Sequence, residues 1–256
     1  QFFSRYDARI VRDSYYQRLL RGATKATALE LLERCDQDIP PAFAEIMLCS
    51  KSQLAQDLFV LMELDFKRDG FFVEFGATDG YHLSNTFLLE KRFNWSGILA
   101  EPAIKWHRAL FDNRTAIIET ECVWVESGLK LLFNEVDDGE LSTIDNFSAS
   151  DNHSANRKSG KKYEVNSISL NDLLDKHSAP EVVDYLSVDT EGSEYEILSK
   201  LDFGKRIFRV ITVEHNHTKN REKIYRLLVS KGYARKFEDL SDFDDWYIFV
   251  GDLEKE

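Results

Sequence analysis

The chain has 256 residues, of which 43% are hydrophobic and 30% are charged, and its formal net charge is −12. This balance is typical of a folded globular protein with room for one large α/β domain and an appendage. The negative charge argues against general binding to nucleic acid or to an anionic membrane, because both need clustered positive charge. No apolar stretch reaches the roughly 18–20 residues of a membrane-spanning helix, so we expect neither a membrane span nor a secretory signal peptide.

The cysteines indicate a reducing compartment. Cys35, Cys49 and Cys122 are odd in number, and their spacings fit neither a disulfide framework nor a zinc site. We expect them to be reduced and mostly packed in the interior, which suits a cytoplasmic protein.

Residues 1–66 carry helical patterning, with Leu54, Leu58 and Leu61 at helical spacing. We therefore expect an N-terminal helical extension or cap over 1–66 and a second domain over 67–256. Residues 1–34 hold seven basic and four acidic side chains, a net charge of +3 in an acidic chain. This is either a solvated helix face or a docking surface, and through residues 1–50 we expect contact with a second copy or with a larger parent polypeptide.

From residue 71 onward, apolar runs typical of buried strands alternate with segments of helical character. We expect strands at 71–75, 97–100, 115–124, 182–188 and 208–214, and helices at 84–92, 103–111, 169–176, 193–200 and 219–231. This alternation predicts a mainly parallel sheet with helices on both faces. The last two predicted strands, Gly232–Phe237 and Asp245–Val250, have no helix between them, so they should pair antiparallel at one edge of the sheet.

The segment Asp145–Lys162 is polar and rich in serine, asparagine and lysine. It has little apolar surface to bury, so we predict a mobile loop. Such a loop is either a lid over a site or an idle insertion.

The stretch Phe71–Gly80, FFVEFGATDG, joins an apolar strand to a glycine turn. Gly76 and Gly80 let the backbone turn sharply and approach a ligand closely. Strand, glycine turn and helix is the arrangement with which open α/β sheets bind nucleotides. The next predicted strand ends in Glu101, 21 residues beyond Gly80, which is about where a ribose-binding carboxylate is expected.

The charges around this turn favour a cationic ligand. Glu74 and Asp79 would repel a pyrophosphate, and the turn lacks the third glycine of G-x-G-x-x-G. S-adenosylmethionine carries an ammonium, a sulfonium and a ribose but no phosphate, so the residues favour it over NAD. An NAD-dependent sugar oxidoreductase and a non-catalytic scaffold domain of a larger glycan-biosynthesis protein are the alternatives.

A second group of polar residues follows two later strands. In Val183–Leu198, VDYLSVDTEGSEYEIL, an apolar strand ends in Asp189 and is followed by Glu191 and Glu194. The strand at 208–214 ends in Glu214. Because parallel strands end at one edge of the sheet, these acids should lie beside the glycine turn and form a candidate site. Glu191 and Glu194 can alternatively begin a helix, where acidic residues are favourable.

His215 and His217 follow Glu214, two residues apart. Two histidines near carboxylates can bind zinc or iron, but no third ligand follows at a spacing typical of metal sites. A catalytic role for His215 and a structural, hydrogen-bonded role are both open.

Together these motifs resemble those of FkbM-type S-adenosylmethionine-dependent methyltransferases. The resemblance covers roughly residues 52–250 and rests, in order, on FFVEFGATDG, SNTFLLE, GILAEP, VDYLSVDTEGSEYEIL and VITVEHN. It implies a Rossmann-like, mainly parallel seven-stranded sheet with an antiparallel edge strand. It also implies O-methylation of a hydroxyl group on a saccharide or natural-product acceptor, with Trp106, Trp124 and Trp246 available to stack on sugar faces or to pack in the core.

The resemblance also implies roles for individual residues. Glu74, Gly76 and Asp79 would line the methionine moiety, Glu101 would hold the ribose hydroxyls, and Gln53 with Asp57 would close the site. The expected cofactor-binding set is Glu74, Gly76, Ala77, Asp79, Gly80, Asn85, Glu101, Pro102, Glu121, Cys122 and Asp189.

The expected catalytic residues are Asp189, Glu214 and His215, which lie at the reacting end of the implied site. An alcohol is a weak nucleophile, so a base is expected to help, and Asp189 or His215 would take the hydroxyl proton. In a variant of this mechanism, Asp189 and Glu214 hold Mg²⁺, which would bind and acidify a pair of sugar hydroxyls.

Overall fold

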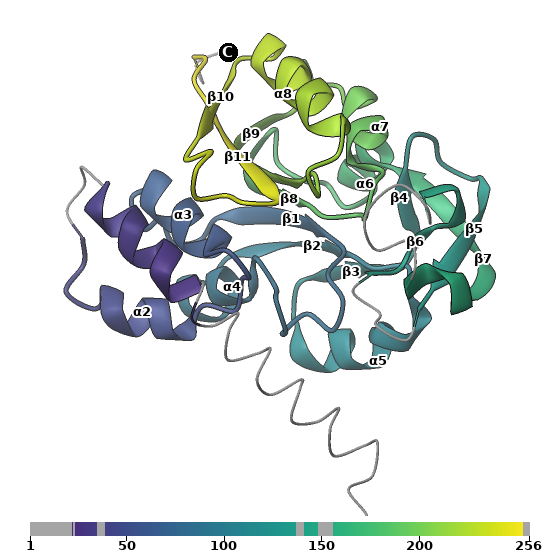
Figure 1. The fold of residues 1–256 in the computed structure, drawn as a ribbon, viewed down its shortest axis with the longest axis horizontal. Coiled ribbons are helices and arrows are strands. Elements are labelled where there is room, and N and C mark those ends of the chain that lie inside the picture. The colour runs from purple at the N-terminus through teal and green to yellow at the C-terminus, as the bar shows by residue number, and fades with distance from the viewer. Residues whose placement is uncertain (1–21, 23, 35–38, 137–140, 148–155, 253–256) are drawn as a thin grey trace, which may run out of the picture.

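A seven-stranded sheet forms the centre of the protein, in the strand order β10-β11-β9-β8-β1-β2-β3 (Figure 1). The computed structural model describes residues 22, 24–34, 39–136, 141–147 and 156–252. The strands of this sheet are β1 (Phe71–Phe75), β2 (Ser96–Ala100), β3 (Ile117–Glu119), β8 (Val182–Val188), β9 (Ile207–Glu214), β10 (Tyr233–Lys236) and β11 (Asp244–Phe249).

The strand directions confirm the predicted sheet. β3, β2, β1, β8 and β9 pair in parallel, whereas β11 pairs antiparallel with both β9 and β10. The antiparallel strand therefore lies one position in from the edge, and β10 forms the edge itself. The central strands β1 and β8 match their predicted bounds because their side chains are almost all buried, which gives the continuous apolar runs of a covered parallel sheet.

Helices cover both faces of the sheet. Phe72 and Val73 are neighbours in β1, and because successive side chains of a strand alternate, they belong to different hydrophobic clusters. The cluster around Val73 includes Leu173, Ile197 and Ile224, which come from the three helices on that face. These helices are α6 (Leu170–Lys176), α7 (Glu194–Ser199) and α8 (Asn220–Ser230).

The cluster around Phe72 is filled by helices from the first half of the chain. It contains Leu31, Phe43 and Leu58 from the N-terminal helices and Leu88 from α4. Residues 24–33 are helical, and the other helices of the first half are α2 (Phe43–Cys49), α3 (Gln56–Glu63), α4 (Phe87–Phe93) and α5 (Ile104–Asn113). The N-terminal helices thus share a core with the sheet, and the boundary after residue 66 stays a prediction. Most of the basic segment 1–34 lies outside the described residues.

A second sheet, not expected from the sequence, has the order β4-β7-β5-β6. Its strands are β4 (Cys122–Trp124), β5 (Lys130–Glu135), β6 (Thr143–Ile144) and β7 (Lys161–Ser169). The prediction of one strand over 115–124 was wrong. β3 ends at Glu119, and β4 begins at Cys122 and pairs with β7 of the small sheet. Figure 1 shows the small sheet at one end of the molecule, near α5.

The predicted loop 145–162 is partly described. It holds short 3₁₀ turns at Asp145–Phe147 and Asn156–Ser159, and β7 begins at Lys161, while residues 148–155 lie outside the described residues. Cys49 and Cys122 carry free thiols, as expected, and Cys35 is not described. Within the described ranges, the helices are too short or too polar to cross a bilayer.

Candidate active site

A cavity of about 300 Å³ lies where the parallel strands end. Its wall is formed by residues at and after the ends of β1, β2, β8 and β9, which is where open α/β sheets bind their ligands. Most of the residues expected to bind the cofactor or to act in catalysis line it, namely Glu74, Gly76, Asn85, Glu101, Pro102, Cys122, Asp189 and Glu214. Gln53 lines it as well.

Three expected residues shape the glycine turn without lining the cavity. The backbone N–H of Gly80 donates to the carbonyl oxygen of Ala77 at 2.8 Å, which closes the turn. A carboxylate oxygen of Asp79 accepts the backbone N–H groups of Tyr81 and His82, each at 2.8 Å. These contacts hold the backbone that borders the cavity, and they leave Asp79 engaged with its own turn.

Glu121 and Asp57 also lie outside the cavity lining. Glu121 is partly exposed and lies 3.0 Å from the Lys176 ammonium. Asp57 is fully buried, and one of its oxygens accepts the Ser52 hydroxyl at 2.6 Å and the Leu58 N–H at 2.8 Å. Both carboxylates therefore hold local structure.

His215 is buried behind the cavity and does not line it. Its Nε2 lies 3.7 Å from an oxygen of Asp245, and its Nδ1 accepts the backbone N–H of His217 at 3.0 Å. Burial lowers the pKa of His215 to about 4, although Asp245 acts in the opposite direction. The imidazole is therefore neutral at pH 7 and lies between the ends of β9 and β11, and its predicted catalytic role stays a prediction.

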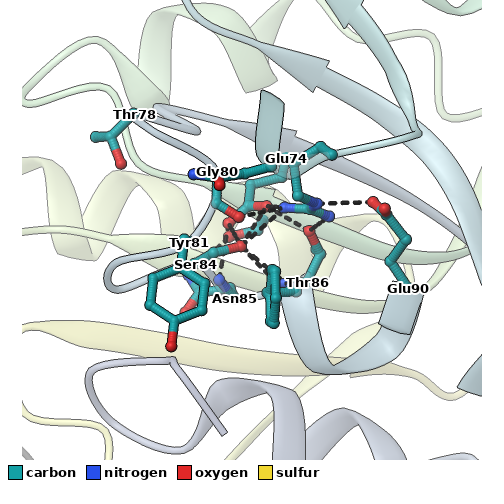
Figure 2. A network of polar contacts seen from close by, with 12 residues as sticks. Glu74, Thr78, Gly80, Tyr81, Ser84, Asn85, Thr86 and Glu90 are labelled. Carbon is teal, nitrogen blue, oxygen red and sulfur yellow. Dashed lines mark hydrogen bonds and ion pairs between the residues drawn. The ribbon is translucent and has the colours of Figure 1, made fainter. Parts of the chain in front are cut away.

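Glu74 binds the segment that follows the glycine turn (Figure 2). Its carboxylate accepts the backbone N–H of Asn85 at 2.8 Å, the Ser84 hydroxyl at 3.2 Å and the Thr86 hydroxyl. These bonds explain why α4 begins at Phe87, three residues later than predicted. Glu74 was expected along the methionine moiety; the structure engages its oxygens in holding residues 84–86 at the cavity wall.

Arg114 ties this segment to its surroundings, and sequence reasoning missed it. Its side chain is fully buried, and Nε donates to Glu90 at 2.7 Å. The remaining guanidinium nitrogens donate to the Gly80 carbonyl at 3.2 Å and to the Thr86 hydroxyl at 2.8 Å. Nothing in the sequence separates this arginine from surface arginines, because its partner Glu90 lies 24 residues away in the chain.

Asn85 presents an unpartnered acceptor at the cavity wall. Its Nδ2 donates to the Ser187 hydroxyl at 2.9 Å, which fixes the orientation of the amide. Its Oδ1 is buried and has no hydrogen-bond partner among the described residues. A buried acceptor without a partner is costly, so a ligand N–H or O–H in the cavity would stabilise it.

Glu101 joins the end of β2 to the glycine turn. One carboxylate oxygen accepts the Thr78 N–H at 2.8 Å, and the other accepts the Ala103 N–H at 2.7 Å. Burial raises the pKa of Glu101 to about 7; the two backbone bonds act against this shift, and the nearby charge of Asp189 adds to it. The carboxylate is thus held rigidly at the cavity wall and titrates near neutral pH.

An acidic triad, defined here as Asp189, Glu191 and Glu214, closes the other end of the cavity. Each residue offers one oxygen, and these oxygens lie within 4.8 Å of one another. One oxygen of Glu214 is buried without a hydrogen-bond partner in the described part of the chain. Burial, reinforced by Asp189 and Glu191, raises the pKa of Glu214 well above its usual range. Clustered carboxylate oxygens of this kind fit Mg²⁺.

The small sheet supplies the remaining wall of the cavity, which sequence reasoning did not anticipate. Phe133 of β5 and residues 141–144 line it. The Thr143 hydroxyl donates to the carbonyl oxygens of Thr190 and Glu191, each at 3.2 Å. Arg157 donates from Nη2 to Glu191 at 2.7 Å and from Nε to the Leu141 carbonyl, also at 2.7 Å. No sequence signal marks this wall, since β6 has only two residues.

The protein thus has a Rossmann-like sheet with an acid-lined cavity at its strand ends, where folds of this class bind nucleotides and related ligands. The carboxylates of the lining suit a positively charged ligand. Residues 74–254 match the Methyltransferase FkbM domain. The chain therefore belongs to the FkbM methyltransferase family and is an S-adenosylmethionine-dependent methyltransferase. This finding confirms the resemblance read from the sequence and sets aside the oxidoreductase alternative.

Solved methyltransferase structures match the chain at low similarity. Precorrin-6y C5,15-methyltransferase from Geobacter metallireducens is 12% identical, with a TM-score of 0.43 over 78% of this chain and 88% of that chain. An S-adenosylmethionine-dependent methyltransferase from Aquifex aeolicus is 8% identical, with a TM-score of 0.38 over 84% of this chain and 100% of that chain. No curated protein sequence matches the chain significantly.

Proposed function

We propose that the protein transfers a methyl group from S-adenosylmethionine to a hydroxyl group of a saccharide or natural-product acceptor. One observation carries the proposal: the unpartnered Asn85 Oδ1, in the segment before α4, and the rigid Glu101 carboxylate, at the end of β2, belong to the wall of one cavity, and they would accept hydrogen bonds from the amino-acid moiety and the ribose. Family membership supplies the reaction class, and the oxygen nucleophile and the saccharide are the proposed part.

The donor site uses fixed acceptors. When bound, S-adenosylmethionine supplies a methyl group on a positively charged sulfur, which makes that carbon electrophilic. Glu101 would accept the ribose hydroxyls, and Asn85 would accept a hydrogen bond from the donor's ammonium. Gly76 has no side chain, so a ligand can approach its backbone closely. Its positive φ of 69° is a conformation that residues with side chains rarely adopt. Preorganised acceptors of this kind avoid the cost of ordering on binding.

Asp189 is the proposed general base. It follows β8, lines the cavity and is half-buried, so an acceptor hydroxyl can reach it from the open side. Removal of the hydroxyl proton by a positioned carboxylate contributes about 10²–10⁴-fold to the rate. Burial raises the pKa of Glu214 well above its usual range, which favours the protonated form, and in that form Glu214 could donate a hydrogen bond to an acceptor oxygen. The alternative base, His215, lies outside the lining, which favours Asp189.

A magnesium ion is a second hypothesis for the same step. Asp189 and Glu214, joined by Glu191, would hold it through carboxylate oxygens. Bound there, the ion would lower the pKa of coordinated sugar hydroxyls.

The tryptophans do not support the saccharide assignment. Trp246 is fully buried, and neither it nor Trp106 or Trp124 lines the cavity. The aromatic side chains at the cavity wall include Phe75, Phe133 and Phe243. The saccharide assignment therefore rests on the family resemblance.

A transfer assay tests the proposal. The purified chain is incubated with methyl-labelled S-adenosylmethionine and panels of sugars, peptides and lipids, and the products are identified by mass spectrometry. Methyl transfer to a sugar hydroxyl is the expected result. Transfer to a peptide or a lipid, with no transfer to any sugar, would refute the saccharide acceptor.

A further inference from the structure

Acidic side chains dominate the polar lining of the cavity. Six carboxyl side chains belong to it, namely Glu74, Glu101, Asp189, Glu191, Glu214 and Asp244. Among the described residues, no lysine or arginine belongs to this lining. The basic side chain at the wall is that of His82, which is exposed and whose Nδ1 lies 2.6 Å from Asp79.

Two buried arginines near these acids, Arg114 and Arg157, already have carboxylate partners. Arg114 is bound to Glu90 at 2.7 Å and lies 3.7 Å from Glu74. Arg157 is bound to Glu191 at 2.7 Å, and its side chain is fully buried. Arg114 therefore balances Glu90 behind the wall, Arg157 balances Glu191 in the lining, and neither arginine lines the cavity itself.

By sequence, the two segments that flank residues 141–147 add no lysine or arginine to this part of the chain. Residues 137–140 read DDGE and residues 148–155 read SASDNHSA, so neither contains a lysine or an arginine. In the part of the chain that the structure describes, Glu214 also has a buried oxygen without a hydrogen-bond partner, which a positive charge or a hydroxyl donor would stabilise. A phosphate at the same place would find no lysine or arginine in the described lining, whereas an ammonium there would favour the ionised forms of Asp189 and Glu214.

We infer that the acceptor is a polyol without phosphate, sulfate or carboxylate groups, and that a protonated amine is its best-matched substituent. This inference rests on the proposed function and narrows its substrate class. Nucleoside diphosphate sugars are excluded as acceptors, because their pyrophosphate would be desolvated among like charges. An amine-bearing sugar instead places its ammonium near Asp189 and Glu214.

Three matched ligands test the inference: glucose, glucosamine and glucose 6-phosphate. Their affinities for the complex of the full chain with adenosylhomocysteine are measured by ligand-detected NMR, once in EDTA and once in Mg²⁺. We expect glucosamine to bind tightest and glucose 6-phosphate to bind at least about tenfold more weakly than glucose, because like charges at low dielectric repel strongly.

A charge insertion provides the second arm. Leu141→Lys places an ammonium on the cavity lining, and Leu141→Gln is the matched uncharged control. We expect Leu141→Lys to raise the affinity for glucose 6-phosphate about tenfold over the control and to lower the affinity for glucosamine. An unchanged affinity for glucose 6-phosphate would mean that shape, and not charge, selects the acceptor, which overturns the inference.

The outcomes separate the two proposals. Binding of glucose 6-phosphate as tight as that of glucose, with or without Mg²⁺, overturns the inference and leaves the methyltransferase assignment standing. Absence of binding by all three ligands, in a protein that binds adenosylhomocysteine, overturns both the saccharide class and the inference. Failure to bind adenosylhomocysteine overturns the proposed donor site.

Discussion

Gly76 lies against Asp189 so closely that a Cβ atom at position 76 would come within 2.1 Å of the Asp189 carbonyl oxygen. The contact follows from the sheet, since β1 and β8 are parallel neighbours with Glu74 opposite Ser187. The two chain segments leave the sheet side by side, one into the glycine turn and the other into the acidic triad. This contact fixes the position of the glycine turn relative to Asp189 at the cavity wall.

Gly76→Ala should therefore destabilise the protein by about 2–4 kcal/mol, through a strained positive φ and displacement of the Asp189 backbone. Gly128→Ala is the matched control: Gly128 also has a positive φ, of 81°, but a Cβ added there would meet no atom of the described residues within 4 Å beyond its chain neighbours. The control should lose only about 1 kcal/mol. Urea unfolding measures both, and equal losses would show that the contact with Asp189 carries no strain.

Arg114→Met should cost about 3–5 kcal/mol of unfolding free energy, because Glu74 and Glu90 lose a buried cation, although Glu90 keeps its pair with Lys91. Arg226→Met is the control: Arg226 is 77% exposed and pairs with Glu222 on the surface of α8, so its loss should cost less than about 0.5 kcal/mol. Adenosylhomocysteine should also bind Arg114→Met more weakly, since residues 84–86 lose their support. Unchanged affinity in a folded variant would contradict a positioning role.

The stability contributed by Arg114 should depend on pH. Burial acts to raise the pKa of Glu90, but Arg114 and the hydrogen bonds to that carboxylate outweigh it and lower the pKa to about 2. A carboxyl with a lowered folded-state pKa stabilises the protein fully above its unfolded value, 4.5, and this stabilisation is lost as the pH falls toward 2. The difference in unfolding free energy between wild type and Arg114→Met should thus decrease below pH 4.5. A difference that stays constant from about pH 7 to about pH 2.5 would contradict the Arg114–Glu90 pair.

Donor affinity should rise with pH through neutrality. The pKa of Glu101 is about 7, and its carboxylate form is the better acceptor for ribose hydroxyls. Protonation below pH 7 weakens binding, so the Kd of adenosylhomocysteine should be about tenfold higher at pH 6 than at pH 8. His82 also lines the cavity, and His82→Gln should keep the pH dependence. Loss of the dependence in His82→Gln would assign it to the imidazole.

Chelation separates the two catalytic hypotheses. Direct proton transfer to Asp189 predicts full methyl transfer in EDTA, whereas a magnesium ion held by the triad predicts loss of activity in EDTA and recovery with added Mg²⁺. Adenosylhomocysteine affinity, measured in parallel, should not change in either case, because the proposed donor contacts involve no metal. Full activity in the chelator eliminates the metal hypothesis.

Strands could be predicted from the sequence where nearly all of their side chains are buried. β1 and β8 are apolar along most of their length, so their bounds and the acids that follow them could be predicted. β7 reads KKYEVNSIS, with exposed polar residues through its first half, and it resembles loop as much as strand until β5 pairs with it. The small sheet and the cavity wall that it forms could therefore not be predicted from the sequence.

Buried charges were equally hard to find. Arg114 and Arg157 acquire their roles from Glu90 and Glu191, which lie 24 and 34 residues away in the chain. The spacing of polar and apolar residues along the chain does not indicate such distant ion pairs. The same limitation applies to Glu74: its position on β1 was predictable, but its hydrogen bonds to residues 84–86 were not.

If Glu101 holds the ribose of S-adenosylmethionine in this cavity, its removal should weaken donor binding, which calorimetric titration measures. Wild type should bind adenosylhomocysteine but not NADH, and Glu101→Ala should weaken binding at least about 100-fold, because a charged acceptor of two hydroxyls is lost. Glu164→Ala, which removes an exposed carboxylate of β7, should bind like wild type. Binding by Glu101→Ala within about threefold of wild type, or a preference for NADH, would contradict the account.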